Sequence, residues 1–106
     1  MTDAAQPHER RAHPRYQVRG TAIIDYEGAY QGAPIKDISL GGVRVAPEVP
    51  LPAGAVVPVD ILLLEGGVVV ATAEVVRSDD SGTGLRFRWP GEGDQSRLLL
   101  REALGG

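Results

Sequence analysis

Short apolar runs rich in Val and Ile alternate with polar positions along most of the chain. From Val18 onward, Gly, Pro or Asp interrupts these runs about every eight to twelve residues, a spacing typical of an all-β sandwich or barrel. The fold class predicted is therefore all-β. The pattern predicts strands at about 18–26, 33–39, 42–46, 56–64, 68–78 and 83–88.

Turn residues separate the longest of these strands. Glu65 is followed by Gly66 and Gly67, and two successive glycines supply the positive φ angles that a tight hairpin turn requires. The run from Asp79 to Gly82 predicts the next hairpin. In the strand between these turns, every second residue is apolar, so one of its faces is predicted to lie inward. That apolar set consists of Val69, Ala71, Ala73 and Val75.

The chain ends on a helical pattern. Asp94 or Gly93 can cap its N-terminus, leucines and an alanine follow at helical spacing over 98–104, and Gly105 predicts its end. We expect this helix to plug or cover the barrel. At the other end, residues 1–9 are small and polar and include Pro7, which predicts a disordered lead-in to a single domain at 10–106.

Composition excludes several classes of protein. The chain has 106 residues, enough for one core, and its lack of cysteine excludes disulfides, a thiol nucleophile and a cysteine-based zinc site. No run approaches the roughly 20 apolar residues of a membrane span and no signal peptide is visible, so we expect a cytoplasmic protein without membrane insertion. Neither a nucleophile with its base nor a metal-ligand set can be assembled, which argues against an enzyme, a cofactor or a bound metal.

Charge and aromatic content argue against DNA or RNA as a ligand. The net charge is −3, whereas general nucleic-acid binders carry a basic excess. Five aromatic residues and one lysine also fit poorly with an oligonucleotide-binding barrel, which stacks bases on exposed rings. Positive charge is instead local, because four arginines and one acid lie between His8 and Arg19. A small anionic ligand is therefore expected at one end of the molecule.

The first candidate site is the arginine-rich segment 10–16. Arg11 and Arg15 would share one face of a helix, but Pro14 opposes a helix and places both on an irregular loop before the first strand. Each guanidinium offers a planar fork of donors for a phosphate or for the O6/N7 edge of guanine, and its flat face can stack on a base. The alternative is a solvated basic arm, the commonest fate of such a charge run.

The second candidate site is the segment 37–42, between two predicted strands. Asp37 and Ser39 are predicted to share one face, where the carboxylate can accept from the N–H donors of a guanine edge and the hydroxyl can donate or accept. Gly41 and Gly42 allow the backbone to turn closely against a ligand. Arg44, just beyond them, is predicted to face outward. The alternative is an ordinary β-turn in which both polar side chains bond local backbone.

Together the two segments resemble the PilZ family. Its mark is an RxxxR motif before the first strand and a [D/N]xSxxG motif some twenty residues on, and here these run from Arg11 to Arg15 and from Asp37 to Gly42. Segments 42–45, 51–54 and 84–87 look like the family's framework turns and last strand, so the likeness covers about residues 10–90.

The resemblance implies a six-stranded antiparallel PilZ-type β-barrel with a C-terminal α-helix, which holds cyclic di-GMP on its outer surface. Arg11 and Arg15 would contact phosphate and guanine, Asp37 and Ser39 would contact the other guanine edge and nearby backbone, and Gly42 would leave room for the ligand. In the family, the residue just before the first motif arginine is associated with whether one dinucleotide or a stacked pair is bound. The hypothesis for this chain is that Arg10 adds a stacking or phosphate contact and favours the pair.

We therefore predict a receptor that changes conformation on binding cyclic di-GMP and regulates an unknown effector protein, in motility, biofilm or exopolysaccharide control. A nucleotide-independent interaction adaptor of the same fold is the alternative, and mutation of the arginines would separate the two.

Overall fold

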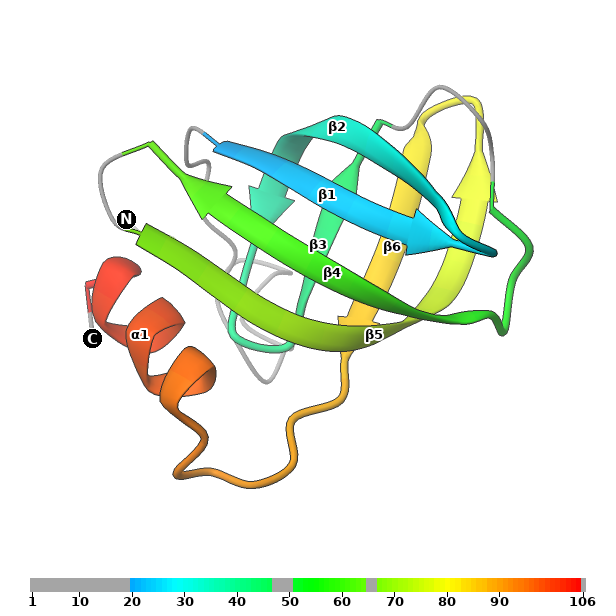
Figure 1. The fold of residues 1–106 in the computed structure, drawn as a ribbon. Coiled ribbons are helices and arrows are strands. Elements are labelled where there is room, and N and C mark those ends of the chain that lie inside the picture. Colours follow the sequence, from blue (N-terminus) through cyan, green and yellow to red (C-terminus); the bar gives the residue numbers. More distant parts are fainter. Residues whose placement is uncertain (1–19, 47–50, 65–66, 106) are drawn as a thin grey trace, which may run out of the picture.

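The strands of the sequence pattern form a closed antiparallel barrel (Figure 1). The structure is a computed structural model that describes residues 20–46, 51–64 and 67–105. Around the barrel the strands follow the order β1-β2-β3-β6-β5-β4, and β1 pairs with β4 to close it. The strands are β1 (Gly20–Tyr26), β2 (Ala29–Ile38), β3 (Gly42–Val45), β4 (Val56–Leu63), β5 (Gly67–Asp79) and β6 (Gly82–Phe87). The predicted six-stranded antiparallel barrel is thus confirmed.

Within the described residues, the strand boundaries agree with the predicted ones to within one residue except at the start of β2, and residues 18 and 19 of the first predicted strand lie outside the described residues. We predicted this strand from residue 33, but it begins at Ala29, directly after a two-residue turn at Glu27 and Gly28. Both turn residues have positive φ, 53° and 84°, which matches the tight reversal between β1 and β2. Gly32 and Pro34 make this stretch resemble a loop, and pairing with β1 from Tyr26↔Ala29 onward holds it as a strand instead.

Aliphatic side chains from all six strands fill the interior. The predicted inward set of β5 is buried, with exposed fractions of 8% or less. Leu51 and Leu100 add to the core from outside the strands. Because the core is complete inside the barrel, the outer face of the sheet is left to carry a ligand site.

The helix α1 (Gln95–Ala103) covers the barrel beside the start of β5 (Figure 1). Its N-terminus is capped as predicted, because the Asp94 carboxylate accepts from the Arg97 N–H at 3.2 Å. Leu100 is fully buried in the barrel core. β5 pairs with β6 only from Ala73 onward, and within the earlier part of β5 the Val70 N–H donates to Ser96 Oγ at 3.1 Å. The helix therefore occupies the place along β5 that a longer β6 would fill.

Two β-bulges interrupt the alternation of inward and outward side chains. In β2, Lys36 and Asp37 lie opposite Arg44 alone, and in β5, Val76 and Arg77 lie opposite Gly84 alone. Without the bulges Asp37 and Arg77 would lie on the inward face, two residues after Ile35 and Val75. With them, both side chains lie on the outer face of the barrel.

Among the described residues, no helix has the length and apolar composition that a membrane crossing needs.

Candidate functional site

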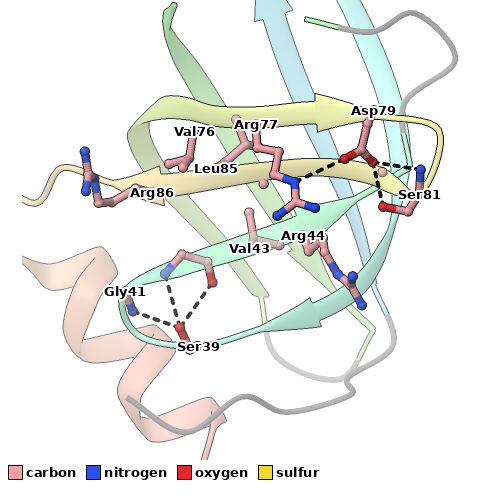
Figure 2. Close-up of a pocket in the computed structure, with 13 residues that line it drawn as sticks. Ser39, Gly41, Val43, Arg44, Val76, Arg77, Asp79, Ser81, Leu85 and Arg86 are labelled. Atoms are coloured by element: carbon pink, nitrogen blue, oxygen red, sulfur yellow. Dashed lines mark hydrogen bonds and ion pairs between the residues drawn. The ribbon is translucent and has the colours of Figure 1, made fainter. Parts of the chain in front are cut away.

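A groove of about 460 Å³ lies on the outer face of the barrel, over β3, β6 and β5. Figure 2 shows it between the 39–42 turn and the β5–β6 hairpin. Its walls include three arginines, one from each of these strands, and its lining is rich in glycine. The lining consists of Ser39, Gly41, Gly42, Val43, Arg44, Val76, Arg77, Asp79, Ser81, Gly82, Gly84, Leu85 and Arg86. Three residues of the second predicted motif thus contribute directly to this groove.

Ser39 organises the turn at one side of the groove. β2 ends at Ile38, so Ser39 begins the turn and does not continue the strand. Its hydroxyl oxygen accepts from the N–H groups of Gly41 (3.1 Å) and Gly42 (3.2 Å), and Ser39 is only 5% exposed. The prediction that Ser39 shares an outer strand face with Asp37 is therefore wrong. The alternative, a serine that bonds the backbone of its own turn, describes this residue.

The same turn is fastened to the end of β6. Trp89 Nε1–H donates to the Leu40 carbonyl at 2.9 Å, and the Phe87 N–H donates to the Gly41 carbonyl at 2.9 Å. The Trp89 ring lies against the Phe87 ring, with centroids 4.9 Å apart. These two hydrogen bonds hold the 39–42 turn in a fixed position beside the groove.

Gly42 lies in close contact with β6. A Cβ atom at this position would lie 2.3 Å from the Leu85 carbonyl oxygen, far inside any normal contact. We expected Gly42 to leave room for a ligand, but the space that a side chain would take here belongs to the neighbouring strand. The packing of β3 on β6 is enough to require a glycine.

Asp37 lies at the edge of the groove and is bound to Arg44. Both Nε and Nη2 of Arg44 lie 3.0 Å from Asp37 Oδ2, across the β2–β3 pairing. The Asp37 side chain is 14% exposed and that of Arg44 is 49% exposed, which confirms that Arg44 faces outward. The carboxylate is thus held in place by a guanidinium that itself lines the groove.

The opposite wall of the groove comes from β5 and β6. Arg77 Nε lies 3.1 Å from Asp79 Oδ2, and Arg86 Nη2 lies 3.3 Å from Glu74 Oε1. Hydrogen bonds from the Ser81 hydroxyl and the Ser81 N–H, together with Arg77, lower the pKa of Asp79 to about 2. Asp79 is therefore ionised at neutral pH, and its bonds to Ser81 confirm the turn role predicted for it.

Sequence reasoning missed Arg77 and Arg86 as site residues. Strict alternation from Val75 would turn Arg77 inward, and the bulge that reverses its direction leaves no clear mark in the sequence. Arg86 faces outward between Leu85 and Phe87, as alternation predicts, but nothing along the chain shows that it lies beside the second motif. The pairing of Gly42 with Arg86 brings these two segments together.

Arg10, Arg11 and Arg15 lie outside the described residues, so their position relative to the groove stays a prediction. In the part of the chain that the structure describes, no three His, Cys, Asp or Glu side chains are grouped to hold a metal ion. The groove offers guanidinium donors, carboxylate acceptors and exposed backbone, a chemistry suited to a ligand with phosphates and planar bases.

Comparison with known proteins identifies the barrel. The chain resembles the PilZ domain of CeSA from a cellulose-synthesizing bacterium (TM-score 0.66, 18% identity, covering 87% of this chain and 96% of that one). It is also similar to the PilZ domain of Escherichia coli YcgR with c-di-GMP (TM-score 0.63, 18% identity, 89% and 94% covered). The K. pneumonia MrkH–c-di-GMP complex matches with a TM-score of 0.68 and 24% identity over 90% of this chain and 52% of MrkH.

No curated protein matches the chain. The family model of the PilZ domain, in contrast, matches residues 9–105, nearly the whole sequence. The chain therefore belongs to the PilZ domain family.

Proposed function

We propose that this PilZ domain is a receptor for cyclic di-GMP that binds its ligand in the groove over β3, β6 and β5. The observation that carries the proposal is the position of the 39–42 turn, whose Ser39, Gly41 and Gly42 line a groove that three arginines also line. Solved relatives of the same fold, YcgR and MrkH, are described with c-di-GMP bound. The role we assign to the groove is binding without catalysis, and the bond of the Ser81 hydroxyl to Asp79 belongs to the turn between β5 and β6.

Each motif residue would contact a different part of the ligand. Arg11 and Arg15 would contact phosphate and a guanine edge, and Asp37 would accept from guanine N–H donors while Arg44 holds it. Ser39 would act mainly through the turn, because its hydroxyl oxygen fixes the N–H groups of Gly41 and Gly42. Arg10 would add a further stacking or phosphate contact and favour a stacked ligand pair.

Ligand binding would then change the surface that another protein meets. The segment that contains Arg10, Arg11 and Arg15 precedes β1, and contacts with the ligand would draw it against the groove. A ligand can shift this equilibrium only through its different affinity for the two arrangements, which the arginine contacts supply. The output would be control of an effector protein in a cytoplasmic setting, in motility, biofilm or exopolysaccharide formation.

Isothermal titration of the purified protein with cyclic di-GMP tests the proposal. We expect binding by the unaltered protein and no binding of GTP. Charge-assisted hydrogen bonds contribute about 1.5 to 3 kcal/mol each, so Arg11→Ala or Arg15→Ala should weaken binding roughly ten- to a hundredfold and the double variant should abolish it.

A double variant of equal charge serves as the control. Arg88 and Arg101 are exposed and lie outside the groove lining, so Arg88→Ala with Arg101→Ala should bind as the unaltered protein does. A folded protein that binds no cyclic di-GMP would refute the receptor function and favour the nucleotide-independent adaptor. Equal loss of binding in both double variants would instead indicate a general effect of charge.

A further inference from the structure

Four residues form one row across the outer face of the barrel. Asp37 on β2 pairs with Arg44 on β3, Arg44 pairs with Gly84 on β6, and Gly84 pairs with Arg77 on β5. Both bulges of the barrel lie in this row, one on each side of the β3–β6 pair. Each bulge turns one charged side chain of the row from the inward face to the outward face. In this row, one guanidinium group lies on each side of Gly84, which has no side chain.

Position 84 is a glycine, although none of its described neighbours would clash with a Cβ atom there. A Cβ atom at Gly84 would have no atom of the described residues within 4 Å, whereas one at Gly42 on the neighbouring strand would meet the Leu85 carbonyl oxygen at 2.3 Å. Glycine in the middle of a strand weakens the strand, and such a glycine often marks close approach of a ligand. The absence of a side chain at Gly84 therefore serves the groove, which it deepens down to the backbone of β6.

The arginines that flank Gly84 are held by carboxylates. Arg44 is bound to Asp37 and Arg77 to Asp79, and their side chains are 49% and 75% exposed. Neighbouring strands lie about 4.8 Å apart, so the backbones of β3 and β5 stand roughly 10 Å apart across Gly84. Figure 2 shows Arg44 and Arg77 extending toward the same end of the groove from these two strands.

The space above Gly84 suits a planar ring of a ligand better than a phosphate group. Each guanidinium already has a carboxylate partner, which reduces the charge available to a phosphate, but its flat face can still stack on an aromatic ring. The open floor allows a flat ring to approach the sheet closely, while a tetrahedral phosphate has no need of it.

We propose that the strip over Gly84 receives a guanine ring of the cyclic dinucleotide and that Arg77 stacks on this ring. The inference rests on the proposed function and names the ligand-contacting residues on β5 and β6, two strands where the two family motifs supply no residue. In this proposal, the lack of a side chain at Gly84 makes room for the guanine ring. The bulge in β5 turns the Arg77 side chain toward that ring.

Gly84→Val tests the floor of the site. Valine suits a β-strand, and its Cβ would meet no atom of the described residues within 4 Å, so the melting temperature should stay equal or rise. The added side chain should lower the affinity for cyclic di-GMP at least about tenfold by titration. The matched control is Gly32→Val, at an exposed glycine of β2, where the nearest atom to a Cβ is Ile23 Cδ1 at 3.6 Å. This variant should bind as the unaltered protein does.

Arg77→Lys tests the stacking contact, because lysine keeps the charge and loses the planar face. A lost cation–π contact should weaken binding between about two- and thirtyfold. Arg88→Lys, at an exposed arginine outside the groove, should have no effect.

The outcomes separate the two proposals. Binding by the unaltered protein with loss in Gly84→Val and Arg77→Lys supports the inference. Unchanged affinity in a folded Gly84→Val protein would overturn it and leave the receptor function standing. Unchanged affinity in Arg77→Lys would overturn the stacking contact. A failure of the unaltered protein to bind cyclic di-GMP would refute the proposed function and the guanine assigned to this strip.

Discussion

Replacement of Gly42 by alanine should destabilise the barrel, although it adds only one methyl group. The new Cβ would lie 2.3 Å from the Leu85 carbonyl oxygen, and carbon–oxygen contacts in folded proteins are about 3.3 Å or longer. The two strands must therefore separate by about 1 Å. Neither atom belongs to a flexible side chain, so the strain falls on the backbone of β3 and β6.

The loss in free energy of unfolding can be worked out from the contacts and hydrogen bonds around Gly42. Separation weakens the β3–β6 ladder where Gly42 pairs with Arg86 and strains the bond from the Phe87 N–H to the Gly41 carbonyl, now 2.9 Å. Overpacking costs about 1 to 3 kcal/mol, and each hydrogen bond contributes about 1 kcal/mol net. We expect the free energy of unfolding to fall by about 2 to 5 kcal/mol, which would lower the melting temperature by roughly 10 to 30 °C.

Urea and thermal unfolding followed by circular dichroism measure this loss. Gly32→Ala is the matched control, because its Cβ makes only ordinary contacts with side chains and the change should stay within about 0.5 kcal/mol. An equally small change in Gly42→Ala would refute the reasoning, since it would show that β6 yields to the methyl group at little cost. Loss of ligand binding in this variant would then need another explanation than distortion of the turn.

Three further substitutions test the packing and the hydrogen bonds around the groove. Leu100→Ala removes a fully buried helix side chain and should lower the free energy of unfolding by about 2 to 5 kcal/mol in urea; a loss below 1 kcal/mol would mean that α1 is not part of the core. Trp89→Phe leaves the Leu40 carbonyl without its donor and should cost about 0.5 to 1.5 kcal/mol in the same assay, unless water replaces the indole. Ser81→Ala should raise the pKa of Asp79 from about 2 toward 3.8 in a carboxyl NMR titration. Because the pKa of Asp79 is lower in the folded protein than in the unfolded chain, ionised Asp79 stabilises the folded protein above about pH 4, and this stabilisation is lost as the pH falls toward 2. The Ser81→Ala variant should lose its stabilisation at a higher pH.

The apolar runs and the turn residues between them predicted an all-β sandwich or barrel, and the resemblance to the PilZ family selected the barrel. The inward set of β5 and the hairpin from Asp79 to Gly82 follow from local rules, because side-chain direction in a strand has a period of two and tight turns need particular residues. The helix cap at Asp94 could be predicted for the same reason, since capping depends on neighbouring residues alone.

The candidate site was only partly predictable. Asp37, Ser39, Gly41 and Gly42 could be selected from their spacing, but the bond of Asp37 to Arg44 and the clash at Gly42 depend on neighbours in other strands. Arg77 escaped prediction because a bulge depends on the register with β6 and not on the residues next to it. The half of the groove on β5 and β6 is therefore a product of tertiary pairing.

The hydrogen bond from the Val70 N–H to Ser96 places α1 over an edge of β5 that β6 does not reach. The first part of β5 is long and rich in valine, with Val68 and Val70 exposed, and the helix lies where β6 is too short to pair with it. Uncovered apolar strand edges recruit strands from other molecules and start aggregation. Detachment of the helix would uncover this edge, so we expect a chain whose helix is detached to self-assemble more readily than the intact barrel.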